Sequence, residues 1–424
     1  MAELRDANSN PWYVLMTLYG EQDHVDPKVN QKRAEENCAV WNAWSCQGLD
    51  EDAAAEVAKL AHVDVAETRG WTEMAAKVKR QHRAAMKKRS KDVADYAYPG
   101  FPVFKDDINC SEIQFFNKVV LKNCIFTQDA DFDTATFTQG AYFSSATFTQ
   151  TANFSSATFT QTADFDSATF TQAANFYSAT FDGPAKFVGA KFGVRGADKV
   201  CVPIFTEAAF ARLASFRDAE FVTHYPVLEG TEFREALVVA AKPANWPATD
   251  LVLLDKAAED AKNVPIKEMA KESCAKIRHA LAKQGLPEDE HFFFRREMGF
   301  AAQIGGFWQR LPYRLFGVFS EYGQSIARPS LWLLGLWLVP ALILLSYFAW
   351  VGSFGDSVWR GIDAVGLSFA NIFTVFGFHR LYFEPEQIRE LPALLQVIGA
   401  AQTVLALPLL FFLGLALRKR FRLR

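Results

Sequence analysis

Phenylalanine recurs along the middle of the chain at intervals that alternate strictly between six and five residues. The series comprises thirteen rings: Phe126, Phe132, Phe137, Phe143, Phe148, Phe154, Phe159, Phe165, Phe170, Phe176, Phe181, Phe187 and Phe192. An alanine precedes every ring except the first by two residues, and Cys124 takes that place at the start. A short fixed period is typical of a stacked repeat, in which each unit buries its apolar face against its neighbours.

The residues around each ring alternate in polarity as β-strands do. In Ala157-Thr158-Phe159-Thr160 the apolar side chains point to one side and the threonines to the other, which is a period of two rather than 3.6 residues. The repeat therefore predicts a β-solenoid whose core holds the rings from Phe132 to Phe192 and their alanines.

The repeat unit also resembles a known family. The segments ANFSS (152–156) and ADFDS (163–167) resemble the A-(D/N)-L/F-x-x unit of pentapeptide-repeat proteins, with one extra residue in every second unit. The resemblance implies a right-handed, four-sided helix of about 22 residues per coil, with the central Phe and the preceding Ala inside. A flatter coil of about 11 residues stays open, although facing rings would crowd it.

The rhythm resumes after an interruption at Gly193–Val202. The later rings are Phe205, Phe210, Phe216 and Phe221, and alanines stand before the last three. We therefore expect one solenoid over about 101–240, with the interruption forming a bulge or loop.

Composition and motifs argue against catalysis. The 424 residues carry a net charge of −3 and six scattered cysteines, with no secretory signal at the start. There is no phosphate-binding loop, no G-x-S-x-G motif and no His/Glu pair at metal-binding spacing. We expect no enzymatic activity, no cofactor and no metal, and we expect no nucleic-acid partner.

Two long apolar stretches near the C-terminus predict transmembrane helices. Pro329–Gly355 and Leu391–Leu417 contain no charged residue, and each is long enough to cross a hydrocarbon core of about 30 Å. The predicted spans are about 330–351 and 393–416. Each contains a proline, Pro340 or Pro408, which a membrane helix tolerates when neighbouring groups satisfy the freed carbonyl.

Basic residues indicate the orientation of the two spans. Arg310, Arg314 and Arg328 precede the first span, and the tail RKRFRLR follows the second. We expect an integral protein of the cytoplasmic (inner) membrane with both termini in the cytoplasm. The residues expected at the lipid surface are Arg310, Arg314, Arg418, Lys419 and Arg420.

Between the spans lies a shorter uncharged segment, within 361–378, that is either re-entrant or interfacial. Thr374-Val375-Phe376-Gly377-Phe378 is similar to the TVGYG filter of potassium channels, but Phe376 replaces a glycine and His379 follows where the last glycine would stand. If the segment lines a pore, its lining residues are Asn371, Thr374, Gly377 and His379.

The remaining regions are predicted to be helical. Asp50 caps a short helix over 51–60, and a longer one over 73–95 carries eight Lys or Arg between Lys77 and Lys91. Such a run is a solvated helix face or a contact with anionic lipid. Phe307–Tyr322 mixes aromatic and basic residues as an amphipathic helix on a membrane surface does.

The C-terminal segments EHFFFRRE, SEYGQSIARPS and LALRKRFRLR resemble the membrane-bound branch of pentapeptide-repeat proteins, which implies a solenoid on a two-helix anchor. The expected domains are an N-terminal helical cytoplasmic region (1–100), the solenoid (101–240), a helical linker (250–328), a membrane domain (329–417) and a basic tail (418–424).

Two functions fit these features. The first is a membrane-anchored, non-catalytic scaffold whose cytoplasmic solenoid binds an unidentified protein partner. The alternative is a subunit of an ion-conducting pore gated by the cytoplasmic region. In both we expect a homo-oligomer, because small residues such as Gly399, Ala400 and Gly414 let membrane helices approach closely.

Overall fold

The computed structural model describes residues 4–90, 97–195, 200–249, 266–352, 361–374, 377–378, 383, 388–389 and 391–421. These residues belong to two compact units, Met1–Phe300 and Ala301–Arg424, and each is described by itself. The finer domain boundaries drawn from the sequence stay a prediction.

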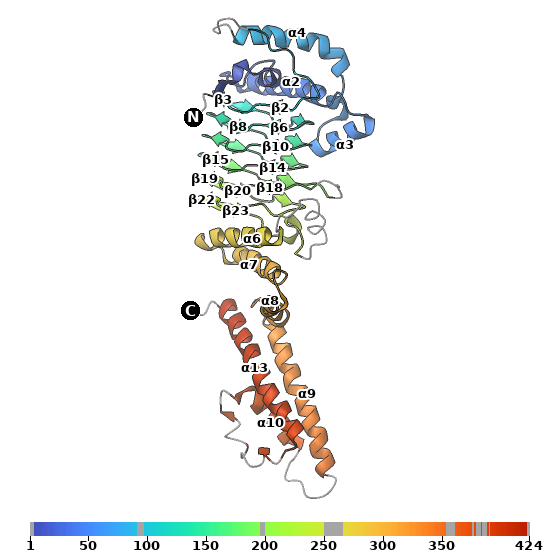
Figure 1. Ribbon diagram of the computed structural model, residues 1–424, viewed down its shortest axis with the longest axis vertical. Helices are drawn as coiled ribbons and strands as arrows, with labels where there is room; N and C mark the ends of the chain where they lie inside the picture. The colour runs from blue at the N-terminus through green and yellow to red at the C-terminus, as the bar shows by residue number, and fades with distance from the viewer. Residues whose placement is uncertain are drawn as a thin grey trace. The chain divides into compact units, whose positions relative to one another are not determined.

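The repeat folds into a four-sided parallel β-solenoid (Figure 1). Its short strands form four ladders, here named faces A to D. Face A consists of β1 (Arg5–Asp6), β3 (Ile113–Phe115), β7 (Thr136–Phe137), β11 (Thr158–Phe159), β15 (Thr180–Phe181), β19 (Ala209–Phe210) and β22 (Glu232–Phe233). Face B consists of β2 (Ile108–Asn109), β6 (Ala130–Asp131), β10 (Ala152–Asn153), β14 (Ala174–Asn175) and β18 (Pro203–Ile204).

The other two faces complete each coil. Face C consists of β4 (Val119–Val120), β8 (Ala141–Tyr142), β12 (Ala163–Asp164), β16 (Ala185–Lys186), β20 (Ala214–Phe216) and β23 (Leu237–Val239). Face D consists of β5 (Ile125–Phe126), β9 (Thr147–Phe148), β13 (Thr169–Phe170), β17 (Lys191–Phe192) and β21 (Glu220–Phe221).

The strand register sets the coil length. Phe159 pairs with Phe137 on one side and Phe181 on the other, so equivalent residues lie 22 positions apart. The predicted four-sided coil is therefore confirmed, and the flatter coil of about 11 residues is excluded. Along face A the strands from β3 to β22 give about six coils.

The phenylalanine rings fill the interior in stacked columns. Phe159 is 1% exposed and lies between Phe137 and Phe181, with ring centroids 4.8 and 4.9 Å away and nearly parallel planes. Rings that are adjacent within a coil meet edge to face, as Phe159 and Phe165 do at 6.1 Å. The column spacing equals the separation of neighbouring strands in a sheet, so every coil adds one ring to each column.

Half of the corners require a left-handed backbone. After Phe154 the chain turns through Ser156, whose φ is 53°, and the amide of Ala157 donates to the carbonyl of Phe154 at 3.2 Å. The same conformation recurs at Glu112, Asn123, Thr134, Ser145, Ser167, Ser178, Glu207 and Asp218, and at Gly189 and Gly230. Since this region favours glycine, most of these corners depend on the stack to hold them.

One solenoid continues across the interruption at Gly193–Val202, of which residues 196–199 are outside the described part of the chain. Ala174 pairs with Pro203, an offset of 203 − 174 = 29 residues rather than 22. The stack nevertheless continues, because Phe192 pairs with Phe221 on face D.

The N-terminal helices close the first coil. They are α1 (Pro11–Met16), α2 (Pro27–Ser45), α3 (Glu51–Ala61) and α4 (Trp71–Arg89), with the short η1 (Ala7–Ser9) and η2 (Val65–Thr68). From α2, Trp41 Nε1 donates to the carbonyl of Ile125 at 2.9 Å, while Asn42 Oδ1 accepts from the Ile125 amide at 2.8 Å. These side chains satisfy strand groups that would otherwise form an open edge.

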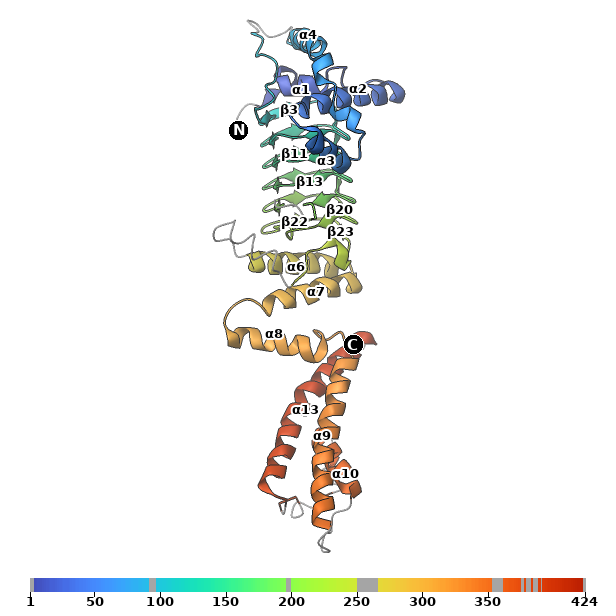
Figure 2. The same cartoon turned by 90° about the vertical axis from the view of Figure 1, so that its right-hand side faces the viewer.

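Helix α3 lies along face D (Figure 2). The outward residues Thr147 and Thr169 of this face are only 1% and 4% exposed. Ile125, at the start of the face, packs with Cys46 and Ala61. As predicted, Asp50 caps α3, and its carboxylate accepts from the Ala53 amide at 2.8 Å.

The last coil is closed by aromatic rings and two helices, α6 (Ile266–Lys283) and α7 (Pro287–Ala301), which follow η3 (Pro243–Asn245). Trp246 stacks on Phe221 with centroids 4.6 Å apart and meets Phe293 of α7 edge to face at 5.0 Å. Ser273 of α6 donates to the carbonyl of Pro226 at 2.5 Å. The solenoid core is therefore covered at both ends within this unit.

The second unit consists of α8 (Phe307–Ser320), α9 (Ala327–Gly352), α10 (Gly361–Ile372) and α13 (Ala393–Arg420). Two of its segments, Ala327–Val351 and Ala393–Arg418, are long and apolar enough to cross a membrane. Helix α10 is apolar but has only 12 residues.

Candidate functional site

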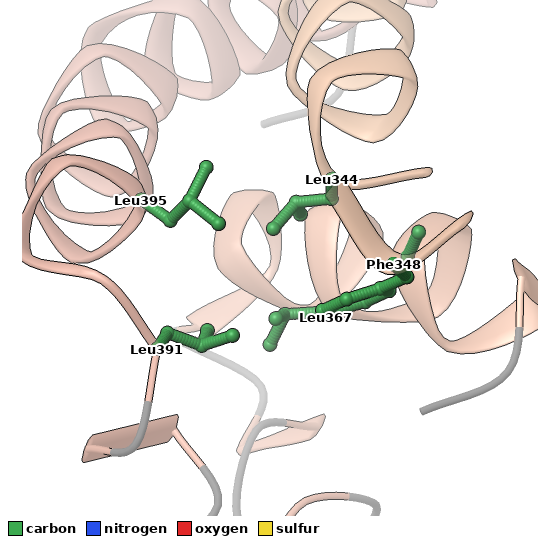
Figure 3. Close-up of a cluster of buried hydrophobic side chains, with 6 residues drawn as sticks. Leu344, Phe348, Leu367, Leu391 and Leu395 are labelled. Carbon is green, nitrogen blue, oxygen red and sulfur yellow. The ribbon is translucent and has the colours of Figure 1, made fainter. Parts of the chain in front are cut away.

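Helix α10 packs between the two long helices and runs antiparallel to α9. In its middle, Leu367 lies against Leu344 and Phe348 of α9 and Leu395 of α13, as Figure 3 shows. At its end, Ile372 joins a second cluster with three residues from the long helices, Leu333, Ala406 and Leu409. Helix α10 therefore extends along much of α9.

Beyond α10 the described residues trace a return toward its start. Gly377 has a φ of +78°, a left-handed conformation that suits glycine. The ring of Phe378 lies 6.0 Å from that of Phe369, and Phe383 lies beside Gly366 and the cluster around Leu367.

A buried polar network joins the three helices. Gln402 of α13 is 2% exposed, and its Nε2 donates to the carbonyls of Leu336 at 2.9 Å and Ser368 at 2.8 Å, and to Ser368 Oγ at 2.7 Å. Ser368 Oγ in turn donates to the carbonyl of Trp337 at 2.7 Å. A polar group in an apolar interior is costly unless it is paired, so this network holds α10 in one position.

Two of the predicted pore-lining residues belong to this network. Asn371 is 6% exposed and its Nδ2 donates to Gln402 Oε1 at 3.1 Å. The hydroxyls of Thr374 and Thr403 both donate to the Asn371 carbonyl, at 2.7 and 3.0 Å. Gly377 lies in the turn, and His379 is outside the described residues. The structure thus brings Asn371 and Thr374 together inside one protomer.

A cavity of about 290 Å³ opens beside the network. Its polar lining comes from Asn371, Gln396, Gln402, Thr403 and Arg389, and the rest of its wall is apolar. The cavity is polar enough to hold water, since amide and hydroxyl groups converge on it.

The residues predicted at the lipid surface lie on α8 and at the end of α13. Arg310 and Arg314 donate to carbonyls of the turn before α8, those of Gly305 and Ala302. Beside them Phe307 and Trp308 are 63% and 79% exposed. Arg418 and Arg420 are exposed; the Lys419 side chain is outside the described residues.

The solenoid offers a different kind of site, a regular polar surface. On face B, Asn153 Nδ2 donates to Asp131 Oδ1 at 2.9 Å, and Asn175 Nδ2 donates to Asn153 Oδ1 at 3.0 Å. These half-buried side chains form a ladder with one member per coil. Such a ladder presents hydrogen-bonding groups at the strand spacing and in fixed orientations.

Two kinds of reactive site, a metal centre and a reactive thiol, find no support among the described residues. They contain no cluster of three His, Cys, Asp or Glu that could hold a metal. All six cysteines are buried, and burial raises the pKa of the Cys46 thiol to about 12 and raises the pKa values of Cys110, Cys201 and Cys274 as well. Protonated thiols are poor nucleophiles.

Sequence reasoning missed Gln402 and Ser368. The available signal was a polar side chain inside a long uncharged stretch, which in membrane helices marks an inward-facing residue. Gln402 lies 31 residues after Asn371 and 34 after Ser368 in the chain, and nothing in a single sequence shows that it meets them.

The repeat is recognised by a family model described as pentapeptide repeats (9 copies), which matches residues 121–169. No curated protein and no solved structure matches the chain. The matched residues form the most regular coils of the solenoid, and the strand register extends the same architecture beyond them.

Proposed function

We propose that this pentapeptide-repeat protein is a membrane-anchored scaffold without catalytic activity, whose solenoid binds a partner protein. The ladder through Asp131, Asn153 and Asn175 carries this proposal, because its polar groups are held by the stack before any partner arrives. Binding to a preorganised surface loses less side-chain freedom. Faces A, B and C are the candidates, since α3 covers the first half of face D.

Photo-crosslinking tests the scaffold. A photoreactive residue is placed at Thr158, Asn175 or Tyr142, one on each candidate face, and at Thr169 beneath α3 as the control. We expect an adduct of defined mass from at least one candidate face and no intermolecular adduct from Thr169. Absence of adducts from all three faces in the native membrane would contradict the proposal.

The anchor consists of α9 and α13, with both chain termini in the cytoplasm. Support comes from the arginines that flank the two long helices and from the exposed aromatic residues of α8, which suit a lipid interface. Because all six native cysteines are buried, new surface cysteines can be labelled selectively. A membrane-impermeant maleimide should label Arg389→Cys in intact cells and leave Lys28→Cys unlabelled; the reverse pattern would invert the topology.

A second candidate function is an ion-conducting pore built from several copies. The course of α10 and its return favour it, because two long helices around a re-entrant segment form a simple pore subunit. Purified protein in planar bilayers tests the idea, together with mass measurement in native-like lipid. Currents altered by Thr374→Ala or Gly377→Ala support the pore. If bilayers that contain verified oligomers carry no current, the pore is excluded and the scaffold remains the proposed function.

A further inference from the structure

Helix α4 carries a dense row of cations that face solvent. Six of its basic residues are exposed: Lys77, Lys79, Arg80, Arg83, Lys87 and Lys88. None of the six forms an ion pair with any residue that the structure describes. By contrast, Arg89 is largely buried and lies 3.9 Å from the Glu21 carboxylate. The helix itself contributes one acid, Glu73, in its first turn.

The opposite side of α4 is fixed to the rest of the N-terminal helices. Val78, His82 and Met86 are 1%, 0% and 0% exposed. The His82 ring contacts the carbonyl of Pro11 at 2.9 Å and the hydroxyl of Tyr98 at 3.0 Å. The helix therefore cannot turn about its axis to bury its basic side chains, because its apolar side is already packed against the first unit.

The surroundings of these basic residues differ from those of a nucleic-acid-binding site. The two rings closest to them are occupied, because Lys79 Nζ lies 5.7 Å from the Phe101 ring and the Arg83 guanidinium lies 5.4 Å from the Tyr98 ring. Proteins that bind single strands need free aromatic faces for stacking. The exposed side of α4 thus offers positive charge and no stacking platform.

We propose that α4 is an electrostatic contact site for an anionic lipid surface. From Lys77 to Lys88 the row is about 16 Å long at 1.5 Å per residue, so its like charges repel one another unless anions neutralise them. Headgroups supply such anions without requiring an apolar insertion. The inference rests on the membrane localisation proposed above, and it does not depend on the scaffold.

Vesicle binding by the full chain tests the site. The protein is held in nanodiscs of neutral phosphatidylcholine and mixed with vesicles of phosphatidylcholine alone or with one quarter phosphatidylglycerol. We expect sedimentation with the anionic vesicles only, weakened in 0.5 M NaCl. At about 1 kcal/mol for each basic residue near the surface, the triple variant Lys77→Gln/Arg80→Gln/Lys87→Gln should bind roughly 100-fold more weakly.

A matched control variant distinguishes the effect of the α4 residues from that of the net charge of the protein. The variant Lys28→Gln/Lys59→Gln/Lys105→Gln removes three exposed cations outside α4 and should bind like the parent. Equal loss in both variants, or equal binding to neutral and anionic vesicles, overturns the assignment. An unchanged melting temperature for both variants shows that lost binding is not lost folding. Because the photo-crosslinking test concerns the solenoid faces alone, the two proposals fail independently.

Discussion

Gln402 donates a hydrogen bond to the carbonyl oxygen of Leu336 at 2.9 Å, the group that Pro340 leaves without its helical donor. In a regular helix the amide four residues later would satisfy this carbonyl, but proline has no N–H. A side chain from another helix replaces it. The proline in α9 and the amide side chain in α13 are therefore parts of one arrangement.

Replacing Gln402 by Leu should destabilise the second unit by about 1–3 kcal/mol, because buried groups of Leu336, Ser368 and Asn371 lose their partner. Thermal unfolding in nanodiscs measures the loss, with Val404→Leu, at a 66% exposed position of the same helix, as control. The cost should shrink when Pro340→Ala restores the helical donor. If the stability losses of the two substitutions simply add, Gln402 does not compensate for Pro340.

Truncation of an inner ring should loosen the solenoid at one coil. Phe159→Ala removes a fully buried ring from its column and should cost about 3–5 kcal/mol. Denaturant unfolding monitored by circular dichroism reports the change. The neighbouring Thr158→Ala, on the outside of the same strand, should have little effect, and equal unfolding of Phe159→Ala and the parent would show that the ring contributes nothing.

One glycine is required by close approach of two coils. A Cβ on Gly183 would lie 2.3 Å from the backbone carbon of Gln161, so Gly183→Ala should force the coils apart and cost about 1–3 kcal/mol. At Gly140 the atoms nearest to an added Cβ belong to the outer end of the Tyr142 side chain, which can rotate away. Gly140→Ala is thus the control, and a Gly183→Ala protein as stable as that control would refute the argument.

Acid should weaken the first unit through His224. This residue is 7% exposed, and burial lowers its pKa to about 4 from the ordinary 6.5. Because the folded pKa is depressed, the unfolded chain binds more protons below pH 6.5, and stability falls as pH drops from about 6.5 toward 4. The full loss is about 3 kcal/mol.

The parent protein should therefore lose more stability between pH 7 and pH 4.5 than the His224→Asn variant does. Denaturant unfolding at each pH measures both losses. His279→Gln, at an exposed position, should retain the parent's pH dependence. If His224→Asn also retains it in full, the buried imidazole is not responsible.

The sequence predicted the features that repeat locally and missed those that depend on distant contacts. The Phe period predicted the strands, the inward rings and the coil length, because each coil copies its neighbour. The left-handed corners at Ser156 and Ser167 carry no glycine signal, and the stack imposes their conformation. Strand β1 and the Trp41–Ile125 hydrogen bond join segments that lie about a hundred residues apart in the chain. No local sequence pattern predicts contacts over such a distance.

In the second unit, too, contacts between distant residues could not be predicted from the sequence. Uncharged stretches were enough to predict α9 and α13, and a short one predicted a third segment near α10. The partners of Asn371 could not be predicted, since a pore and a packed helix interface both place polar groups away from lipid. The contact with Gln402 shows which groups meet within one protomer.

The covers over the first and last coils have a consequence for polymerisation. A bare parallel solenoid ends in unpaired strand edges to which another copy can add, and repeated addition yields a fibre. Here Asn42 and Trp41 occupy the edge at β5, and Trp246 lies over Phe221 at the other end. Solenoids of this protein should therefore not join end to end into fibres.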